Sequence, residues 1–447
     1  MRNRQTIRAA AHALRHGETT SVALTEACLA AIVAHNAATN AFILVDADGA
    51  REAARAADAS RARGVDRGPL DGIPLSLKDL IDVARQPTTA ASRALAHRVA
   101  RTDAPVTARL RAAGAVLVGK TNLHEFALGT TSEDSAWGPV RHPDDPGRSA
   151  GGSSGGSAVA VATGMSLASI GTDTGGSIRI PSAACGVVGL KPSLGEVPTE
   201  GVIPLSRTLD HVGPLAASVQ DAAWVWQAIT GRPFEVVEPV AAAGLTLARI
   251  GGWYDAPVAP EVRAATDAAV AALGAAGVAI TRAELPGLET LRQTYVDLVL
   301  PEAAWWHAPL IEARGDDYTP RVRERIESGR AIPATRYLAA LDHRAALTGI
   351  VNAALGRADA LLLPTLPMVA PRLGEEMLVL DPARPEPEAV RALMLKHTQL
   401  FNITGHPAVS LPLPVAGLPI GLQIVGRRQR TRDLLAIAAA CEKIVAG

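Results

Sequence analysis

Residues 151–179 read GGSSGGSAVAVATGMSLASIGTDTGGSIR and contain two glycine- and serine-rich clusters, at 151–157 and 171–179. The stretch between the clusters begins with small apolar residues that suit a tightly packed helix and ends with apolar residues that suit a strand. A helix and a strand that run back beside each other would return the second cluster to the first. We therefore expect Ser153 and Ser177 to be neighbours in space.

The second cluster has the composition of a turn that presents backbone N–H groups. Glycine has no Cβ, so the chain can turn sharply there and direct successive N–H groups at a developing oxyanion. We predict that Thr174, Gly175, Gly176 and Ser177 supply such donors to the substrate, with Ser177 as the nucleophile. A flexible linker would have the same glycine content, but its flanks would be polar, whereas these flanks are apolar.

Lys78 is the candidate base for this serine. None of the eleven histidines stands inside either cluster. A lysine accepts a proton only when it is neutral, which requires burial to lower its pKa of about 10.4 by roughly three units. Lys78 ends an alternating, strand-like run at residues 73–78 and so has the local sequence of a buried lysine. The alternative is a lysine that reaches solvent or pairs with Asp79.

The rest of the chain alternates between strand and helix patterns. Strands are predicted near residues 115–118, 245–251, 278–285, 361–363 and 420–425, and helices near residues 21–35, 103–114 and 260–273. Asn122 and Glu125 resemble a capping box, which predicts another helix after Asn122. Repeated strand and helix segments of this kind indicate an α/β sandwich.

Composition and charge limit the class of partner. The 447 residues include 44 Lys+Arg and 44 Asp+Glu, so no net charge attracts nucleic acid or an anionic membrane, and a small-molecule substrate is expected. The three cysteines lie too far apart for a disulfide framework or a structural zinc site. No stretch is expected to supply the roughly 20 apolar residues of a membrane-spanning helix. These features predict a cytoplasmic protein.

Together the motifs resemble those of the amidase signature family. The clusters at 151–157 and 171–179, with Lys78 at the customary interval before them, carry the resemblance. It extends through motifs at residues 119–122, 189–192, 209–214, 363–365 and 401–407 and covers roughly residues 60–430. The resemblance implies a single large α/β/α sandwich with a central mixed, mostly parallel twisted sheet covered by helices.

The resemblance also assigns catalytic roles. It implies that Lys78 is the base, that Ser177 attacks the substrate carbonyl, and that Ser153, on a cis peptide bond, relays the proton between them. Ser177 would form an acyl-enzyme, the leaving nitrogen would take a proton through Ser153, and water would release the acid. Asp173 and Arg179 match motif positions too and are interpreted as loop supports. The implied activity is hydrolysis of carboxylic amides to ammonia or an amine and an acid, without metal or cofactor.

One domain, residues 1–447, is the simplest organisation, because no internal repeat or low-complexity linker divides the chain. Residues 1–60 are predicted to form an N-terminal helical segment, followed by the signature core at about 60–430. Within that core, residues 286–345 are less regular and are predicted to be a variable, helical region on the substrate side. We expect a monomer or a homodimer.

Substrate selectivity is expected to come from residues outside the three catalytic side chains. Gly129 and Thr130 are predicted substrate contacts, and residues 295–307 add Trp305 and Trp306, which suit a core as well as a pocket. If either tryptophan lines the entrance, an aryl or other apolar acyl amide is expected. The same acyl-transfer chemistry would extend to anilides, aryl esters or carbamates.

An alternative is a glutaminase-type subunit that releases ammonia from glutamine for transamidation of charged transfer RNA. The three catalytic residues do not distinguish it from a stand-alone amidase. Ile180 follows Arg179 where such subunits typically have Gln, and residues 201–206 look more like those of free-standing amidases. The stand-alone amidase is therefore preferred.

Residues 114–121 match the Walker A pattern literally and would predict nucleotide binding. A Walker loop follows a strand, whereas residues 115–118 are themselves an apolar strand pattern and Gly114 better ends the preceding helix. Nucleotide binding therefore remains a remote alternative.

Two further motifs point to other hydrolases. Residues 151–155 fit the Gly-x-Ser-x-Gly elbow of α/β-hydrolases, but no strand pattern precedes them. His124 and Glu125 begin a zinc-protease pattern whose second histidine is absent, because position 128 is Leu. His124 is interpreted as an ordinary helix residue, and no metal site is predicted.

Overall fold

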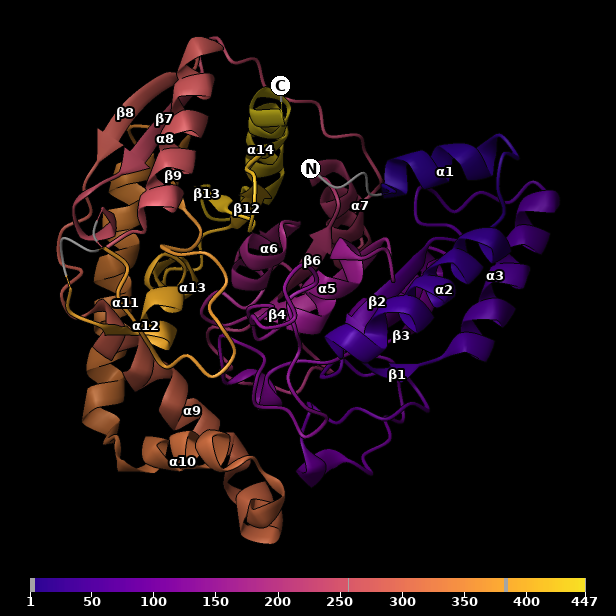
Figure 1. Ribbon diagram of the computed structural model, residues 1–447, viewed down its shortest axis with the longest axis horizontal. Helices are drawn as coiled ribbons and strands as arrows, with labels where there is room; N and C mark the ends of the chain where they lie inside the picture. The colour runs from indigo at the N-terminus through magenta and orange to yellow at the C-terminus, as the bar shows by residue number, and fades with distance from the viewer. Residues whose placement is uncertain (1–4, 256, 382–384, 447) are drawn as a thin grey trace.

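The computed structural model describes residues 5–255, 257–381 and 385–446, in which eleven strands form one sheet through the molecule (Figure 1). Their spatial order is β1-β3-β2-β4-β6-β5-β12-β13-β9-β7-β8. The strands are β1 (Phe42–Val45), β2 (Pro74–Lys78), β3 (Val116–Thr121), β4 (Ala168–Asp173), β5 (Val188–Lys191), β6 (His211–Ala216), β7 (Thr246–Ile250), β8 (Ala279–Ala283), β9 (Ala360–Pro364), β12 (Ala408–Pro412) and β13 (Gly421–Val425). A separate pair is formed by β10 (Met377–Leu378) and β11 (Glu388–Ala389).

The sheet is mixed, so the prediction of an α/β fold around a mixed central sheet is confirmed. β2 pairs in parallel with β3 and β4, and β7 pairs in parallel with β8 and β9. The remaining neighbours are antiparallel. Because β2 and β4 are parallel, their carboxyl ends lie at the same edge of the sheet. This arrangement brings Lys78 beside the chain that leaves β4 at residues 171–179.

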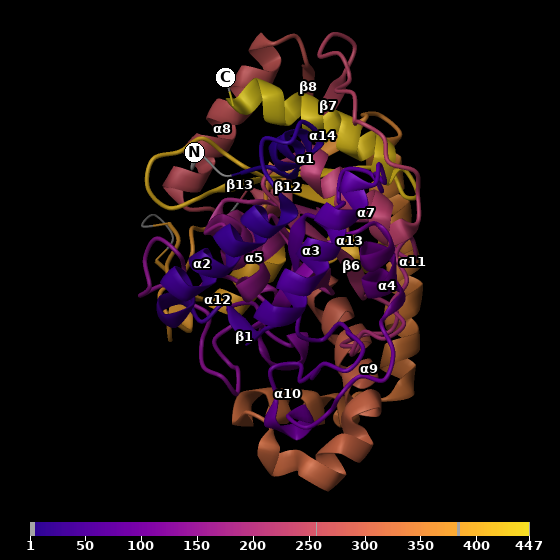
Figure 2. The same ribbon diagram turned by 90° about the vertical axis from the view of Figure 1, so that its right-hand side faces the viewer.

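Helices cover both faces of the sheet (Figures 1 and 2). The longer ones are α1 (Ile7–Arg15), α2 (Ser21–Thr39), α3 (Ala47–Ala62), α4 (Pro105–Ala112), α5 (Gly155–Ala162), α6 (Arg179–Cys185), α7 (Val219–Thr230), α8 (Pro260–Ala275), α9 (Leu291–Arg314), α10 (Pro320–Ser328), α11 (Ala334–Leu355), α12 (Val390–Lys396), α13 (Gln399–Ile403) and α14 (Thr431–Ala446). α5 and α6 pack against each other on the central strands, and α7 and α14 pack together on the opposite face. α9, α10 and α11 occupy most of the stretch predicted to be variable and helical. In Figure 2, α9 and α10 lie in the lower part of the molecule and α11 runs along its right-hand side.

Helix α2 corrects one expectation. Its 19 residues have a mean hydropathy of 1.3 and are, by length and composition, long and apolar enough to cross a membrane. No such stretch was expected from the sequence. In the structure α2 packs against α3, β2 and β3 and buries a third of its most apolar window. A core helix of a globular protein meets the same criterion, so this is weak evidence for membrane insertion.

The loop after β3 also differs from prediction. Asn122 and Glu125 form no capping box, because Phe126 adopts a left-handed conformation with φ 49° and permits only the short 3-10 helix η2 (Glu125–Ala127). The Asn122 side chain instead accepts a hydrogen bond from the N–H of Leu123. Where a helix was expected, the chain forms an irregular loop that leads to Gly129 and Thr130.

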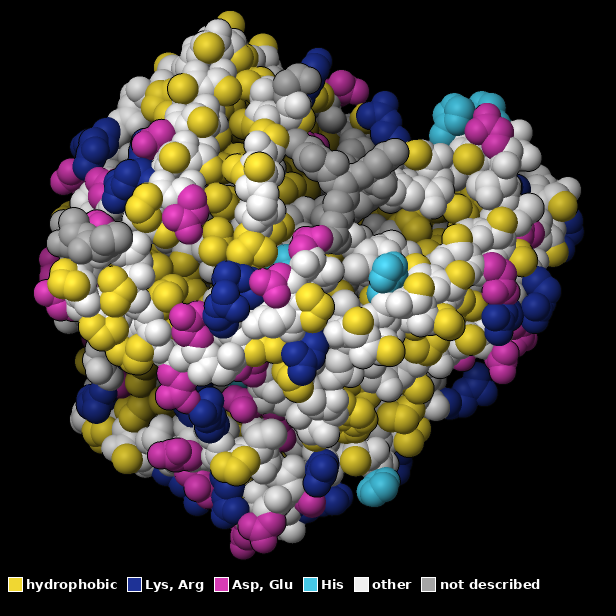
Figure 3. Space-filling model, viewed as in Figure 1, with side chains coloured by type: hydrophobic (Ala, Val, Ile, Leu, Met, Phe, Trp, Pro, Cys, Tyr) yellow, Lys and Arg dark blue, Asp and Glu magenta, His cyan; other side chains and the backbone are white. Residues whose placement is uncertain are grey.

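Positive and negative side chains are interspersed over the face shown in Figure 3. The equal numbers of basic and acidic residues are therefore also mixed in space on this face. An even distribution provides no extended field of one sign to attract a polyanion.

Candidate active site

Lys78 lies at the carboxyl end of β2, completely enclosed by protein. Its Nζ donates hydrogen bonds to Ser153 Oγ at 2.7 Å and to Thr172 Oγ1 at 2.8 Å. It does not pair with Asp79, whose carboxylate lies 2.9 Å from the equally buried Lys120. The alternative of a solvent-exposed or Asp79-paired lysine is therefore wrong, because Lys120 from β3 takes that partner.

Burial lowers the pKa of Lys78 to about 7, because a charged ammonium group is poorly solvated in the protein interior. The carboxylates of Asp210 and Asp173 oppose this shift, since negative charge favours the protonated amine. Near neutral pH the amine is therefore present in comparable neutral and charged populations. A neutral amine of this kind can accept a proton from the Ser153 hydroxyl.

The two glycine- and serine-rich clusters meet in space, as the helix and strand between them predicted. The N–H of Ser154 donates to the carbonyl oxygen of Ser177 at 3.2 Å, and Ser154 Oγ donates to the carbonyl of Thr172 at 3.1 Å. The peptide bond between Gly152 and Ser153 is cis. Ser153 is buried, and the Ser177 side chain keeps 6% of its surface exposed. The structure thus brings Lys78, Ser153 and the Ser177 turn into one site.

The turn before Ser177 depends on its glycines. Gly176 has φ 138°, and a methyl group there would collide with Thr398 Oγ1. Thr398 Oγ1 also donates to the carbonyl of Gly175 at 2.5 Å. Among the described residues, the backbone N–H groups of Gly175, Gly176 and Ser177 form no hydrogen bond to a protein acceptor. They are available to a negatively charged oxygen beside Ser177.

The buried ion pair between Asp173 and Arg179 holds the turn that contains Ser177 in place. Arg179 Nη2 lies 3.0 Å from Asp173 Oδ1, and both side chains are fully buried. Asp173 Oδ2 also accepts from the N–H of Ile178 at 3.1 Å. Arg179 Nη1 donates to Gln423 Oε1, and Arg179 Nη2 donates to Asn402 Oδ1, both at 2.6 Å. These contacts tie the start of α6 to β13 and α13, which is the arrangement expected of loop supports.

Asp173 stays ionised at any working pH. Burial alone would raise its pKa, but the adjacent Arg179 guanidinium holds the pKa well below the usual range of a carboxyl group. Replacing Asp173 by Asn should therefore destabilise the fold by about 3–5 kcal/mol, because it leaves the Arg179 charge buried without its partner. Urea unfolding measures this loss.

The matched control for that measurement is Asp267→Asn, which removes a half-exposed partner of Arg249. An exposed pair of this kind contributes about 1 kcal/mol or less. Equal unfolding midpoints for the two variants would contradict the supporting role of Asp173.

Sequence reasoning missed two groups that face Lys78. Thr172 is its second hydrogen-bond partner, and Asp210 acts on it through charge. Thr174 Oγ1 donates to Asp210 Oδ1 at 2.5 Å, and the N–H groups of Leu205 and Ser206 donate to Oδ2. Both residues lie inside motifs that stand out in the sequence, but only their spatial neighbours reveal their relation to Lys78.

A cavity of about 640 Å³ opens beside the turn. Gly129 and Thr130, the predicted substrate contacts, line it, and a methyl group at Gly152 would lie 3.1 Å from the carbonyl carbon of Thr130. Tyr295 lines the same cavity, and its Oη lies where a methyl group at Gly175 would be. The cavity is therefore lined by residues that lie against the chain segments carrying both serines.

Two tryptophans considered for the pocket lie elsewhere. Trp305 is 64% exposed and stacks with Arg207, while Trp306 packs against Phe126 and His307. Neither lines the cavity. An aryl acyl group was expected only if Trp305 or Trp306 lined the entrance, and neither tryptophan does so in this cavity.

His124 is not a helix residue, contrary to the sequence interpretation. It precedes η2, lines the cavity, and its Nε2 lies 3.3 Å from Asp134 Oδ2. No group of three or more metal-ligating side chains occurs among residues 5–255, 257–381 and 385–446. The Walker A match at 114–121 is mostly strand β3 itself, with Lys120 buried against Asp79, so it forms no phosphate-binding loop.

Residues 23–435 match the model of the protein family described as Amidase. The chain belongs to the amidase family. The match includes β2, both glycine- and serine-rich clusters and the whole central sheet. The resemblance first seen in residues 151–179 is thereby confirmed.

Relatives in this family have different named activities. The chain is 37% identical to a subunit of glutamyl-tRNA(Gln) amidotransferase from Roseiflexus sp. (strain RS-1), covering 98% of this chain and 96% of that protein. It is also 37% identical to AtzE, a subunit of 1-carboxybiuret hydrolase from Pseudomonas sp. (strain ADP), covering 92% of each. A crystal structure of an amidase superposes with a TM-score of 0.93 at 40% identity, covering 99% of this chain and 100% of that one.

Proposed function

We propose that this amidase hydrolyses carboxylic amide C–N bonds through an acyl-enzyme on Ser177, releasing ammonia or an amine and a carboxylic acid. The observation that carries the proposal is the enclosed Lys78 amine, which lies 2.7 Å from Ser153 Oγ and whose pKa burial lowers to about 7. A buried lysine without an ion-pair partner destabilises the fold, so a catalytic role in proton transfer explains its presence better than a structural role.

The proposed reaction begins with proton transfer. Neutral Lys78 takes the proton of Ser153 Oγ while Ser153 takes that of Ser177 Oγ, which attacks the amide carbonyl carbon. The N–H groups of Gly175, Gly176 and Ser177 stabilise the oxyanion. Ser153 then returns the proton to the leaving nitrogen, and water attacks the acyl-enzyme by the same route in reverse. Every step uses protein groups and water.

A substrate panel tests the reaction class. Purified protein is incubated with phenylacetamide, an anilide, an aryl carbamate and glutamine, and product release is measured alongside intact mass. We expect turnover of at least one amide and a transient mass increase that maps to Ser177. The same acyl-transfer chemistry would extend to aryl esters and carbamates. Turnover of amides without any adduct at Ser177 would contradict the acyl-enzyme.

A second candidate is the glutaminase-type subunit of a transfer-RNA-dependent amidotransferase. The relative from Roseiflexus, which bears the name of such an enzyme's subunit, supports it. Ile180 and residues 201–206 favour the stand-alone amidase. Ammonia release from glutamine that requires a copurifying partner would favour the amidotransferase subunit, whereas turnover by the isolated chain would favour the stand-alone enzyme.

Location and assembly remain part of the proposal. We propose a cytoplasmic monomer or homodimer that acts on a small-molecule amide and binds neither nucleic acid nor membrane. The three cysteines are free and buried, as expected of a protein from a reducing compartment. The equal numbers of acidic and basic residues support the proposal that the protein does not bind nucleic acid, because they provide no net positive charge.

Asp210→Asn is expected to move the acid limb of the pH profile to lower pH. Burial raises the pKa of Asp210 to about 6, so the group is mostly ionised at neutral pH and there raises the pKa of Lys78. Its removal lets burial lower the pKa of Lys78 further, and activity then persists to a pH lower by about one unit or less. kcat/KM measured against pH checks this.

The control is Asp221→Asn, which alters another buried carboxyl group that accepts from the N–H of Ile7 and is not among the groups that shift the pKa of Lys78. We expect its profile to match that of the wild type. An upward shift with Asp210→Asn would mean that this carboxylate does not act on the base.

A further inference from the structure

Three arginines converge on the cavity beside Ser177 from different helices. Arg292 comes from α9, Arg325 from α10 and Arg391 from the first turn of α12. Arg292 is exposed, whereas Arg325 and Arg391 are half-buried, and none of the three forms an ion pair among the residues that the structure describes. The single hydrogen bond that these guanidinium groups form within the described part of the chain joins Arg391 Nη1 to the carbonyl of Leu128 at 3.5 Å. The cavity therefore contains guanidinium groups that form no ion pair with another described residue of the protein.

The charges lie close enough to disfavour one another. Burial lowers the pKa of Arg391 to about 10, and the neighbouring charges of Arg325 and Arg292 contribute to the lowering. Burial also lowers the pKa of Arg325, although Asp134 acts in the opposite direction. Arg391 and Arg325 nevertheless stay protonated at neutral pH. Positive groups gathered in a partly buried space are costly unless an anion compensates them.

Four of the five acidic side chains that line the cavity have partners other than these three arginines. Asp134 lies against His124, and Glu376 pairs with Arg321 at 2.5 Å. Glu133 Oε2 accepts from the N–H of Gly374 at 2.9 Å, and Glu375 Oε2 accepts from the N–H of Arg372 at 3.0 Å. Glu324 also lines the cavity, is exposed, and raises the pKa of Arg325 through charge alone.

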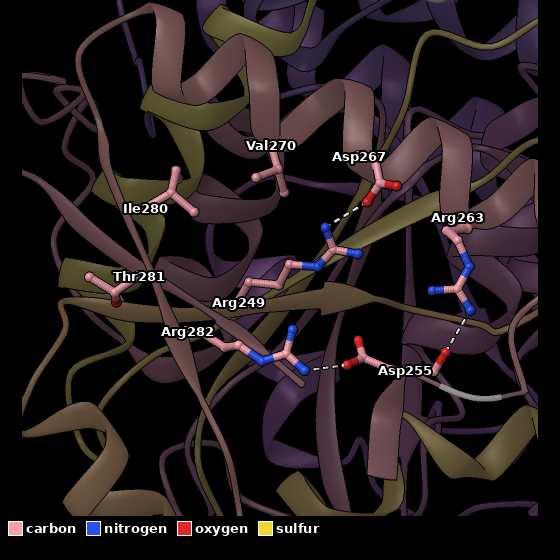
Figure 4. Close-up of a pocket in the computed structure, with 8 residues that line it drawn as sticks. All are labelled: Arg249, Asp255, Arg263, Asp267, Val270, Ile280, Thr281 and Arg282. Carbon is pink, nitrogen blue, oxygen red and sulfur yellow. Dashed lines mark hydrogen bonds and ion pairs between the residues drawn. The ribbon is translucent and has the colours of Figure 1, made fainter. Parts of the chain in front are cut away.

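A second pocket of the same protein shows the opposite arrangement. It measures about 510 Å³ and lies between β7, β8 and α8 (Figure 4). There Arg249 pairs with Asp267 at 2.5 Å, and Arg282 pairs with Asp255 at 2.6 Å. Arg263 donates to the backbone carbonyl of Asp255 at 2.6 Å. Its arginines are satisfied within the protein, whereas those beside Ser177 are not.

The cavity side chains that approach Gly175 in the turn before Ser177 are uncharged. Tyr295 Oη and Leu395 Cδ2 are the atoms that a methyl group at Gly175 would meet. An acyl chain that extends from Ser177 into the cavity would therefore contact these uncharged side chains and share the cavity with the guanidinium groups. Guanidinium groups bind carboxylates through paired, charge-assisted hydrogen bonds.

We propose that the acyl group of the substrate ends in a carboxylate, which Arg391 and Arg325 bind in this cavity. The substrate class is then the monoamide of a short dicarboxylic acid. This inference rests on the proposed amide hydrolysis at Ser177 and narrows it.

The test compares glutaramate with valeramide, in which a methyl group replaces the carboxylate. For the wild type we expect kcat/KM to favour glutaramate by at least about 100-fold, because the half-buried guanidinium groups would remain without an anionic partner when the neutral amide binds. Arg391→Gln should lower kcat/KM for glutaramate about 100-fold, mostly through KM, and change that for valeramide little. Arg282→Gln, in the other pocket, should alter neither. Equal loss on both amides with Arg391→Gln, or a wild-type preference for valeramide, would overturn the proposal.

A binding measurement tests the proposed carboxylate site independently of amide hydrolysis at Ser177. Calorimetry with Ser177→Ala measures glutaramate and valeramide affinity without turnover, and Ser177→Ala/Arg391→Gln provides the comparison. Tight glutaramate binding that Arg391→Gln abolishes supports the carboxylate site even if no amide is hydrolysed. Hydrolysis at Ser177 with no difference in binding between the two amides would overturn the carboxylate site and leave the proposed function intact.

Discussion

Ser177→Ala is expected to lower kcat for amide hydrolysis by about 10⁵-fold or more while leaving the fold intact. Without the hydroxyl no acyl-enzyme forms, and the donors of the turn cannot replace a nucleophile. The hydroxyl group of Ser177 contributes little to stability, since Ser177 Oγ forms no hydrogen bond with any of the described residues. Steady-state kinetics and intact mass measure the loss of kcat and of the acyl-enzyme. Thermal unfolding measures whether the fold remains intact.

Ser182→Ala provides the matched control. Ser182 lies on α6, five residues after Ser177, and its buried hydroxyl has no hydrogen-bond partner among the described residues. The same substitution there should leave kcat within about threefold and stability within about 1 kcal/mol. Residual turnover by Ser177→Ala within tenfold of the wild type would refute Ser177 as the nucleophile.

Lys78→Met should lower kcat by about 10⁴-fold or more, because it removes the group that accepts the proton and breaks the relay through Ser153. Methionine has nearly the shape of the lysine stem and suits an apolar site. Lys78→Arg should be as inactive, since a guanidinium group stays protonated at working pH. Lys443→Met, on α14, controls for loss of a lysine away from the site.

The pH dependence of the wild type distinguishes a base from a structural lysine. Burial lowers the pKa of Lys78 to about 7, and the neutral form is the active one. kcat/KM should therefore rise with pH through about 7 and then level off. A rate that falls as pH rises from 6 to 8 would contradict a neutral amine at position 78.

The same shift links stability to pH. The unfolded chain keeps Lys78 protonated up to its ordinary pKa near 10.5, whereas the folded chain releases that proton near 7. Between these values the unfolded state binds one more proton, so this group makes the folded state more stable as pH rises. Lys78→Met should remove that contribution from the pH dependence of urea unfolding.

Much of the site follows from local sequence. The alternating run at 73–78 predicted the strand that carries Lys78, because Ile73, Leu75 and Leu77 form one apolar face. In the structure every residue of β2 is buried, so Lys78 on the other face is buried too. The small residues between the two clusters predicted α5 and β4, whose return path brings Ser153 and Ser177 together. These features depend on residues close in the chain, where periodicity and glycine content are informative.

Other features required the folded chain. Thr172 contacts Lys78 across 94 residues of sequence, and no local pattern identifies a threonine as the partner of a lysine. The prediction of a helix after Asn122 was wrong, because tertiary contacts hold Phe126 in a left-handed conformation. A capping pattern in the sequence does not reveal such contacts.

The sequence by itself determined the family, the α/β class and the three residues of the proposed relay, because each rests on a compact motif or a local period. Only the tertiary structure decided the character of the acyl site. Arg325 and Arg391 lie on separate helices and approach each other only when α10 and α12 pack around the cavity. Trp305, an equal candidate by sequence, faces solvent instead. The direction of a helical side chain depends on which face its helix buries, and that is fixed by packing between distant segments.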